Sequence, residues 1–192
     1  MNVPNRLTVL RIVLTPIFMA LLFWPFPFHY AAALLVFIAA ALTDYFDGKI
    51  ARSRDLITDL GKFLDPIADK MLTTAALLTF LSLGVLDVWA VMLVLTREFA
   101  VTSVRLMAAG RGKVVAASFA GKMKTVAQYV AIIAMIVALQ WQECGTWLPL
   151  PSLCFSIPVL IAQILLWIAV VLTVISGVQY CWTLREYFTQ DK

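Results

Sequence analysis

The sequence is poor in charged residues and in histidine. Charged residues fill 14% of the 192 positions, and there is a single histidine. Soluble domains carry charges nearly twice as often and spread them along the chain. Here the charges cluster between long uncharged stretches, which argues against a soluble globular protein. The basic residues do not form one solvated patch, so nucleic-acid binding is not expected either.

Cysteine is also scarce, and its spacing excludes a structural zinc site. The three cysteines, Cys144, Cys154 and Cys181, match no zinc-ligand pattern. Cys144 and Cys154 flank one predicted loop. They are expected to be free thiols, with a disulfide as the alternative if that loop faces an oxidising compartment.

Apolar residues, by contrast, are abundant: they make up 62% of the chain, and the mean hydropathy is +0.93. Because backbone polar groups must be paired within lipid, apolar spans are expected to be helices. We therefore predict an all-α integral membrane protein with six transmembrane helices, forming one membrane-embedded domain over residues 1–192. The predicted spans are 10–28, 30–52, 61–84, 87–109, 120–141 and 156–184.

The first span is preceded by a polar lead-in, residues 1–9, and could be confused with a cleaved signal peptide. A retained span is the preferred interpretation, because the apolar run is long for a signal core and contains three prolines.

The basic residues predict the orientation. Nearly all of them lie in or near four places: the start of span one, the loop between spans two and three, the loop between spans four and five, and the end of span six. The three opposite loops contain neither Lys nor Arg. Under the positive-inside rule, both termini are then cytoplasmic, in a cell (cytoplasmic) membrane. Only Lys70 and Arg97 remain away from these places, and both lie inside predicted spans.

Four aspartates form the most informative pattern. Asp44 and Asp47 are three residues apart near the end of span two, and Asp65 and Asp69 are four apart near the start of span three. Each pair shares one helix face, and the short connection returns the second helix antiparallel to the first. Four carboxylates without nearby His or Cys favour hard cations, so we predict two divalent ions, Mg²⁺ or Mn²⁺, at the cytoplasmic edge, engaged in phosphate chemistry.

The residues around these aspartates leave room for a flat group and can bind phosphate. Gly48 and Ala51 leave room beside the helix, Arg52 offers a planar fork for phosphate, and Thr58 adds a hydroxyl from the connecting segment. Two alternatives remain open at this point. Membrane prenyltransferases also use Asp-rich motifs with Mg²⁺, although on two separate helix pairs. An ion transporter would place its acids near the membrane midplane.

The complete pattern resembles the signature of the CDP-alcohol phosphotransferase family. The sequence from Asp44 to Asp69 reads D-x-x-D-G-x-x-A-R, eight further residues, and G-x-x-x-D-x-x-x-D. Members of that family are six-span membrane enzymes that displace CMP from a CDP-linked lipid or alcohol, and they are homodimers. The resemblance implies that the four aspartates bind both metals and that Asp69 is also the general base. It places the nucleotide of CDP-diacylglycerol against Asn5, Thr8, Gly48, Ala51, Arg52 and Thr58.

A basic set of residues further along the chain is a candidate site for the acceptor. The segments 96–105 and 121–125 resemble those of family members whose acceptor is glycerol 3-phosphate. Its dianion would need a basic pocket, for which the candidates are Arg97, Arg105, Arg111, Lys113, Lys122 and Lys124. Ordinary positive-inside topology or contact with anionic membrane lipids is the alternative for Arg105, Arg111 and Lys113. A mid-span Arg97 needs a partner, and the adjacent Glu98 is expected to point elsewhere on the helix.

The sequence thus predicts transfer of a phosphatidyl group from CDP-diacylglycerol to glycerol 3-phosphate. An inositol phosphate or phosphatidylglycerol is the alternative acceptor.

Overall fold

The computed structural model describes residues 3–54, 59–110, 119–145 and 151–189. Side chains are described in these ranges except at 3–5, 44–54, 59–66, 69, 105–110, 152, 181 and 183–189. The described chain contains helices and no strand, which confirms the all-α prediction. The helices are α1 (Val3–Phe23), α2 (His29–Arg54), α3 (Asp59–Ser82), α4 (Val88–Gly110), α5 (Phe119–Cys144) and α6 (Ser152–Thr189).

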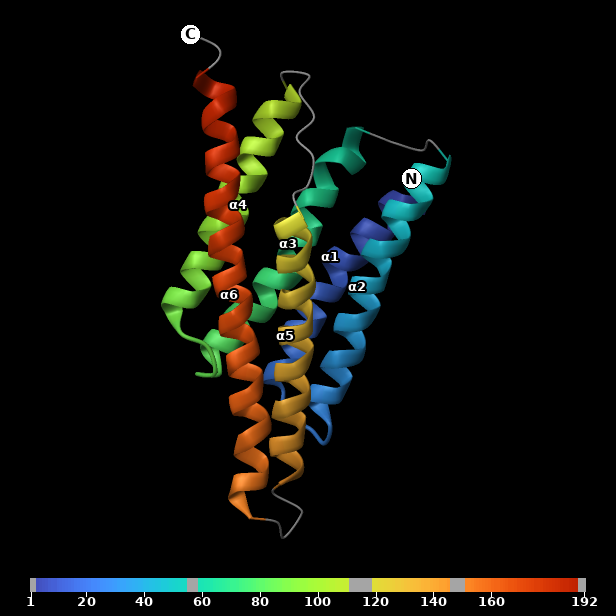
Figure 1. Cartoon of the computed structure of the whole chain (residues 1–192). Helices are drawn as coiled ribbons and strands as arrows, with labels where there is room; N and C mark the ends of the chain where they lie inside the picture. The colour runs from blue at the N-terminus through green and yellow to red at the C-terminus, as the bar shows by residue number, and fades with distance from the viewer. Residues whose placement is uncertain (1–2, 55–58, 111–118, 146–150, 190–192) are drawn as a thin grey trace.

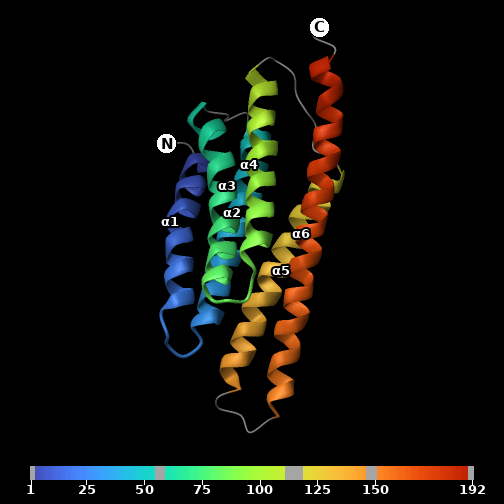
Figure 2. The same cartoon turned by 90° about the vertical axis from the view of Figure 1, so that its left-hand side faces the viewer.

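The six helices run alternately up and down in one bundle (Figure 1). α1 packs against both α2 and α3. α5 packs against both α2 and α6, and α4 packs against both α3 and α6. The end of α2, the start of α3 and the end of α4 lie at the same end of the bundle as the end of α6, and the view turned by 90° agrees (Figure 2). The predicted aspartate motif and much of the predicted basic set therefore belong to one end of the molecule.

The first helix differs from its predicted span at both ends. It begins at Val3, so the expected lead-in of residues 1–9 is largely helical. It ends at Phe23 instead of residue 28, because Pro25 and Pro27 follow, and proline lacks the N–H donor that a helix needs. Phe28 then takes a left-handed conformation (φ 63°), and the Nδ1–H of His29 donates to the Leu21 carbonyl at 3.0 Å.

The turn between α3 and α4 follows from its own residues. Gly84 has φ +72°, a conformation that glycine adopts without strain. Its N–H donates to Leu81 O and that of Val85 to Phe80 O, which is the Schellman arrangement that closes a helix. Asp87 Oδ1 accepts the Trp89 N–H at 2.8 Å and caps α4.

The bundle interior is apolar and tightly packed. Phe37 on α2 stacks between Phe18 of α1 and Tyr129 of α5, with ring centroids 5.4 and 5.6 Å away. Buried alanines let the helices approach closely, as is typical of membrane bundles; they are Ala33, Ala40, Ala68, Ala75, Ala76, Ala90, Ala131, Ala138, Ala162 and Ala169.

The outer surface is apolar as well, and this is a membrane protein. Large side chains such as Leu35 and Trp89 are 70% and 73% exposed, and α6 presents a long series of exposed Ile, Leu, Val and Trp residues. Within the described residues, three helices have the length and composition to cross a membrane: α1, α5 and α6. Shorter apolar stretches occupy His29–Thr43 and Lys70–Ser82. The count of six spans remains a prediction.

The loop from α5 to α6 contains the two cysteines for which a disulfide was the alternative. Cys144 and Cys154 are both free thiols, as expected from the sequence.

Candidate active site

The aspartate motif is divided between two antiparallel helices. Asp44 and Asp47 belong to the C-terminal part of α2, and Asp65 and Asp69 belong to the N-terminal half of α3. Figure 1 shows these segments at the same end of the bundle. The four side chains lie outside the described residues, so their convergence stays a prediction. The described side chains contain no cluster of three or more His, Cys, Asp or Glu, a finding that does not bear on these four.

Most of the predicted nucleotide-binding side chains also lie outside the described residues. Gly48, Ala51 and Arg52 are in α2 and Asn5 is in α1, with their side chains outside the described set, as is all of Thr58.

Thr8 is the described member of the predicted nucleotide set. Its side chain is fully buried, at 0% exposure, on the face of α1 that also carries Arg11 and Thr15, both buried. Because α1 packs against α2 and α3, this polar stripe lies next to the two helices that carry the aspartates. The Thr15 hydroxyl donates to the Arg11 carbonyl at 2.9 Å.

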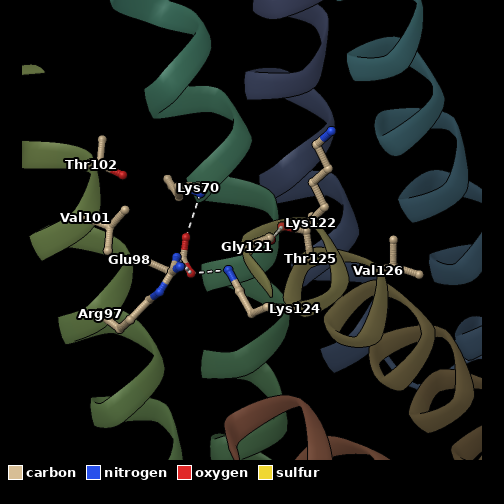
Figure 3. Close-up of a pocket in the computed structure, with 10 residues that line it drawn as sticks. All are labelled: Lys70, Arg97, Glu98, Val101, Thr102, Gly121, Lys122, Lys124, Thr125 and Val126. Carbon is tan, nitrogen blue, oxygen red and sulfur yellow. Dashed lines mark hydrogen bonds and ion pairs between the residues drawn. The ribbon is translucent and has the colours of Figure 1, made fainter. Parts of the chain in front are cut away.

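A second polar site lies between α3, α4 and α5 and is built around the carboxylate of Glu98. Its Oε2 is 2.6 Å from Lys70 Nζ of α3. Its Oε1 pairs with Lys124 Nζ of α5 and lies 3.3 Å from Arg97 Nη1. The Glu98 side chain is only 6% exposed and that of Lys124 only 3%. One buried carboxylate thus joins three cations from three helices (Figure 3).

These groups line a cavity of about 380 Å³. Its wall comprises Lys70, Arg97, Glu98, Val101, Thr102, Gly121, Lys122, Lys124, Thr125 and Val126. In Figure 3, Lys122 extends away from the Glu98 cluster while the other three cations converge on it. Among the wall residues that the structure describes, four cationic side chains outnumber one carboxylate, and the cavity's volume suits a small anionic molecule.

The cavity brings together three of the residues that the sequence assigned to the acceptor phosphate: Arg97, Lys122 and Lys124. The Arg105 side chain, Arg111 and Lys113 lie outside the described residues. Sequence reasoning missed Lys70, Glu98 and Thr102 as wall residues.

The expectation that Glu98 points away from Arg97 is wrong. Consecutive helical residues differ by about 100° in direction, yet the long guanidinium side chain bends far enough to bring Nη1 to 3.3 Å from the carboxylate. A signal was present in the sequence. Ionisable groups within a membrane are rarely left unpaired, so the two mid-span cations Lys70 and Arg97 should have been matched with the acid in the same region.

Arg97 is also held from a fourth helix. A Cβ at Gly177 of α6 would lie 2.9 Å from Arg97 Cγ, so the aliphatic stem of the arginine packs directly on the glycine. Its Nε is buried and has no hydrogen-bond partner among the described residues. The backbone of α6 therefore sets how far the guanidinium reaches into the cavity.

The helical architecture, the motif on α2 and α3 and the basic cavity together define a membrane transferase of the family that the sequence resembles. A family model for CDP-alcohol phosphatidyltransferase matches residues 1–175, and the chain belongs to this family.

Three relatives with assigned activities match the chain over most of its length. The chain is 41% identical over 191 residues to a CDP-diacylglycerol–glycerol-3-phosphate 3-phosphatidyltransferase of Bacillus subtilis (strain 168), covering 93% of each chain. It is 41% identical over 183 residues to a probable phosphatidylglycerophosphate synthase of Mycobacterium tuberculosis (strain H37Rv), covering 93% of this chain and 79% of the relative. A CDP-diacylglycerol–glycerol-3-phosphate 3-phosphatidyltransferase of Rickettsia bellii is 34% identical over 187 residues, 97% of each.

Proposed function

We propose that this enzyme transfers the phosphatidyl group of CDP-diacylglycerol to glycerol 3-phosphate, giving phosphatidylglycerophosphate and CMP. Two of the relatives carry both substrates in their names, and the third is named for the product. The proposal also places residues 1–192 in one catalytic domain, with the active site and both termini on the cytoplasmic side of the cell membrane. The clustering of Lys and Arg in alternate connections supports that orientation. A homodimer is proposed from the family resemblance.

The observation that carries the proposal is the positive cavity between α3, α4 and α5. A phosphomonoester has a charge of about −1.5 to −2 at neutral pH. Lys70, Arg97, Lys122 and Lys124 exceed the single carboxylate of Glu98 by enough positive charge to balance such a group. Phosphatidylglycerol, a phosphodiester with a bulky diacyl part, matches this small cavity less well.

The donor set on α2 and α3 fits divalent metal ions. Carboxylate oxygens are the ligands that Mg²⁺ and Mn²⁺ prefer, and four exceed what one Mg²⁺ ordinarily takes from protein. We assign Asp44, Asp47, Asp65 and Asp69 as ligands of two such ions. When bound, the ions neutralise charge that develops on the diphosphate.

The other residues bind the two substrates and move one proton. Asn5, Thr8, Gly48, Ala51, Arg52 and Thr58 hold the nucleotide and diphosphate, while the diacylglycerol chains remain in lipid. Asp69 accepts the proton of the glycerol 1-hydroxyl. The resulting alkoxide attacks the phosphorus that bears diacylglycerol, a new P–O bond forms, and the bond from that phosphorus to the CMP oxygen breaks.

Arg97, Arg105, Arg111, Lys113, Lys122 and Lys124 complete the proposal as the set that holds the acceptor phosphate. Charge-assisted hydrogen bonds from such cations are short and directional, and they would fix the position of the glycerol 1-hydroxyl relative to Asp69.

CMP release by the purified protein tests the proposal. CDP-diacylglycerol is supplied with glycerol 3-phosphate, inositol phosphate, serine or phosphatidylglycerol as the acceptor. We expect rapid turnover with glycerol 3-phosphate and little with the others. Rapid turnover with a different acceptor alone would replace the assigned acceptor while leaving the reaction class intact.

A further inference from the structure

Among the described residues of the cavity wall, Glu98 is the one acidic group, and it is deeply buried. An acid at the binding site of an anion repels that anion, so its presence needs a reason. Both carboxylate oxygens have cationic partners. Oε1 pairs with Lys124 and Arg97, and Oε2 pairs with Lys70. Figure 3 shows the carboxylate at the centre of the three cations.

These ion pairs connect three helices at one point. Lys70 belongs to α3, Arg97 and Glu98 to α4, and Lys124 to α5. Three cations this close would repel one another and separate if the carboxylate were absent, because like charges at short range repel and Arg97 and Lys124 are largely buried. Glu98 therefore keeps the cations in defined positions before any anion arrives, and such preorganisation favours tight and oriented binding.

The position of Lys70 extends this effect to the proposed catalytic centre. Lys70 directly follows Asp69, the proposed base, in α3. A link from α3 to the cations of α4 and α5 fixes how far the base lies from the group that holds the acceptor phosphate. That spacing decides whether the hydroxyl of a bound acceptor reaches the base.

We propose that Glu98 is a positioning residue for the acceptor. It holds Arg97, Lys124 and Lys70 in the arrangement that binds the acceptor's phosphate, without touching that phosphate itself. This inference rests on the proposed function, since it assumes a phosphorylated acceptor in the cavity.

Glu98→Gln distinguishes positioning from simple electrostatics, because the two predict changes of opposite sign in the KM for glycerol 3-phosphate. The substitution keeps the shape of the side chain and makes the cavity more positive. If charge alone governed binding, the KM for glycerol 3-phosphate would fall. Positioning predicts the opposite, a rise of about tenfold or more as the cations lose their anchor. The kcat should fall as well, because the acceptor hydroxyl is held less accurately against the base, and the KM for CDP-diacylglycerol should not change.

Three further variants complete the experiment. Glu98→Asp retains the charge and should recover part of the lost affinity. The double variant Glu98→Gln with Lys70→Gln removes one charge of each sign, so that Lys70 is not left as a cation without its Glu98 partner. Its KM for glycerol 3-phosphate should remain raised. Glu143→Gln is the matched control: Glu143, near the far end of α5, accepts a hydrogen bond from Gln140 at 2.8 Å and lies outside the cavity wall. It should behave as wild type.

The inference is overturned if Glu98→Gln leaves the KM for glycerol 3-phosphate unchanged or lowers it, or if kcat alone falls. It is also overturned if the double variant returns to the wild-type KM, which is the informative comparison should the single variant fail to fold. Wild-type protein without CMP release from glycerol 3-phosphate would instead refute the proposed function, so the two failures are distinguishable.

Discussion

Gly177→Ala tests whether α6 sets the reach of Arg97 into the cavity. The added Cβ would lie 2.9 Å from Arg97 Cγ and 3.9 Å from its Cβ. Ordinary contact begins near 3.4 Å, so the arginine stem or the helix has to move by about 0.5 Å. Arg97 Cγ, the atom that would clash, is in the middle of the side chain. Because the guanidinium lies beyond it, a rotation that moves Cγ displaces the guanidinium further.

The expected size of the effect follows from this displacement. Misplacing a binding group by about 1 Å can cost up to about a hundredfold in rate. We therefore expect kcat/KM for glycerol 3-phosphate to fall about 10- to 100-fold, equivalent to about 1.4–2.8 kcal/mol. Overpacking should also reduce the stability of the fold by about 1–3 kcal/mol. The KM for CDP-diacylglycerol should not change.

Initial rates of CMP release at varied acceptor concentration measure the first effect, and thermal unfolding in detergent measures the second. Gly145→Ala is the matched control, because its Cβ would lie 2.7 Å from the ring of Phe155, beyond the end of α5 and outside the cavity wall. It should lose stability to a similar extent but retain the wild-type KM for glycerol 3-phosphate. A folded Gly177→Ala protein with wild-type acceptor kinetics would refute the idea that α6 positions Arg97.

Three further predictions address the proposed metal and base residues and the helix turns. Asp69→Asn should abolish CMP release while the protein still inserts and purifies normally, and retained turnover would remove Asp69 as the general base. Chelation with EDTA should stop turnover, and Mg²⁺ or Mn²⁺ should restore it; undiminished activity in a chelator would contradict the assigned aspartate ligands. Gly84→Ala should cost about 1 kcal/mol, because a Cβ strains the backbone at φ +72°, and should lower Tm by about 2–4 °C without changing kinetics. An unchanged Tm would show that the turn relaxes freely.

Hydropathy alone predicted an all-α membrane fold correctly, and the described residues form six helices. That all six cross the membrane remains a prediction. Helix boundaries were less accurate where local chemistry intervenes. Pro25 and Pro27 end α1 before the apolar run is finished, and α1 begins at Val3 within a segment whose polarity suggested a lead-in. Apolarity indicates where a chain can lie in lipid, whereas the loss of backbone donors decides where a helix stops.

The sequence yields a prediction of the metal site where the residues are close along the chain. The aspartate motif is visible because both pairs fall on helices joined by a short connection. The Glu98 cluster was missed because it joins residues 26 and 28 positions away on other helices, Lys124 and Lys70. The mid-span cations Lys70 and Arg97 indicated that an acid pairs with them. Which side chains meet depends on the rotation of each helix about its axis, and a single sequence does not contain that information.

The sharing of α3 between the two sites has a consequence for redesigning the enzyme. Asp69 is followed directly by Lys70, so the single helix α3 carries both the proposed base and a residue of the proposed acceptor cavity. The rest of the cavity wall comes from α4 and α5. To change the alcohol substrate, α4 and α5 are the helices to vary, while α3 is best left unchanged. The same division would let natural selection exchange acceptors without rebuilding the bond-forming chemistry.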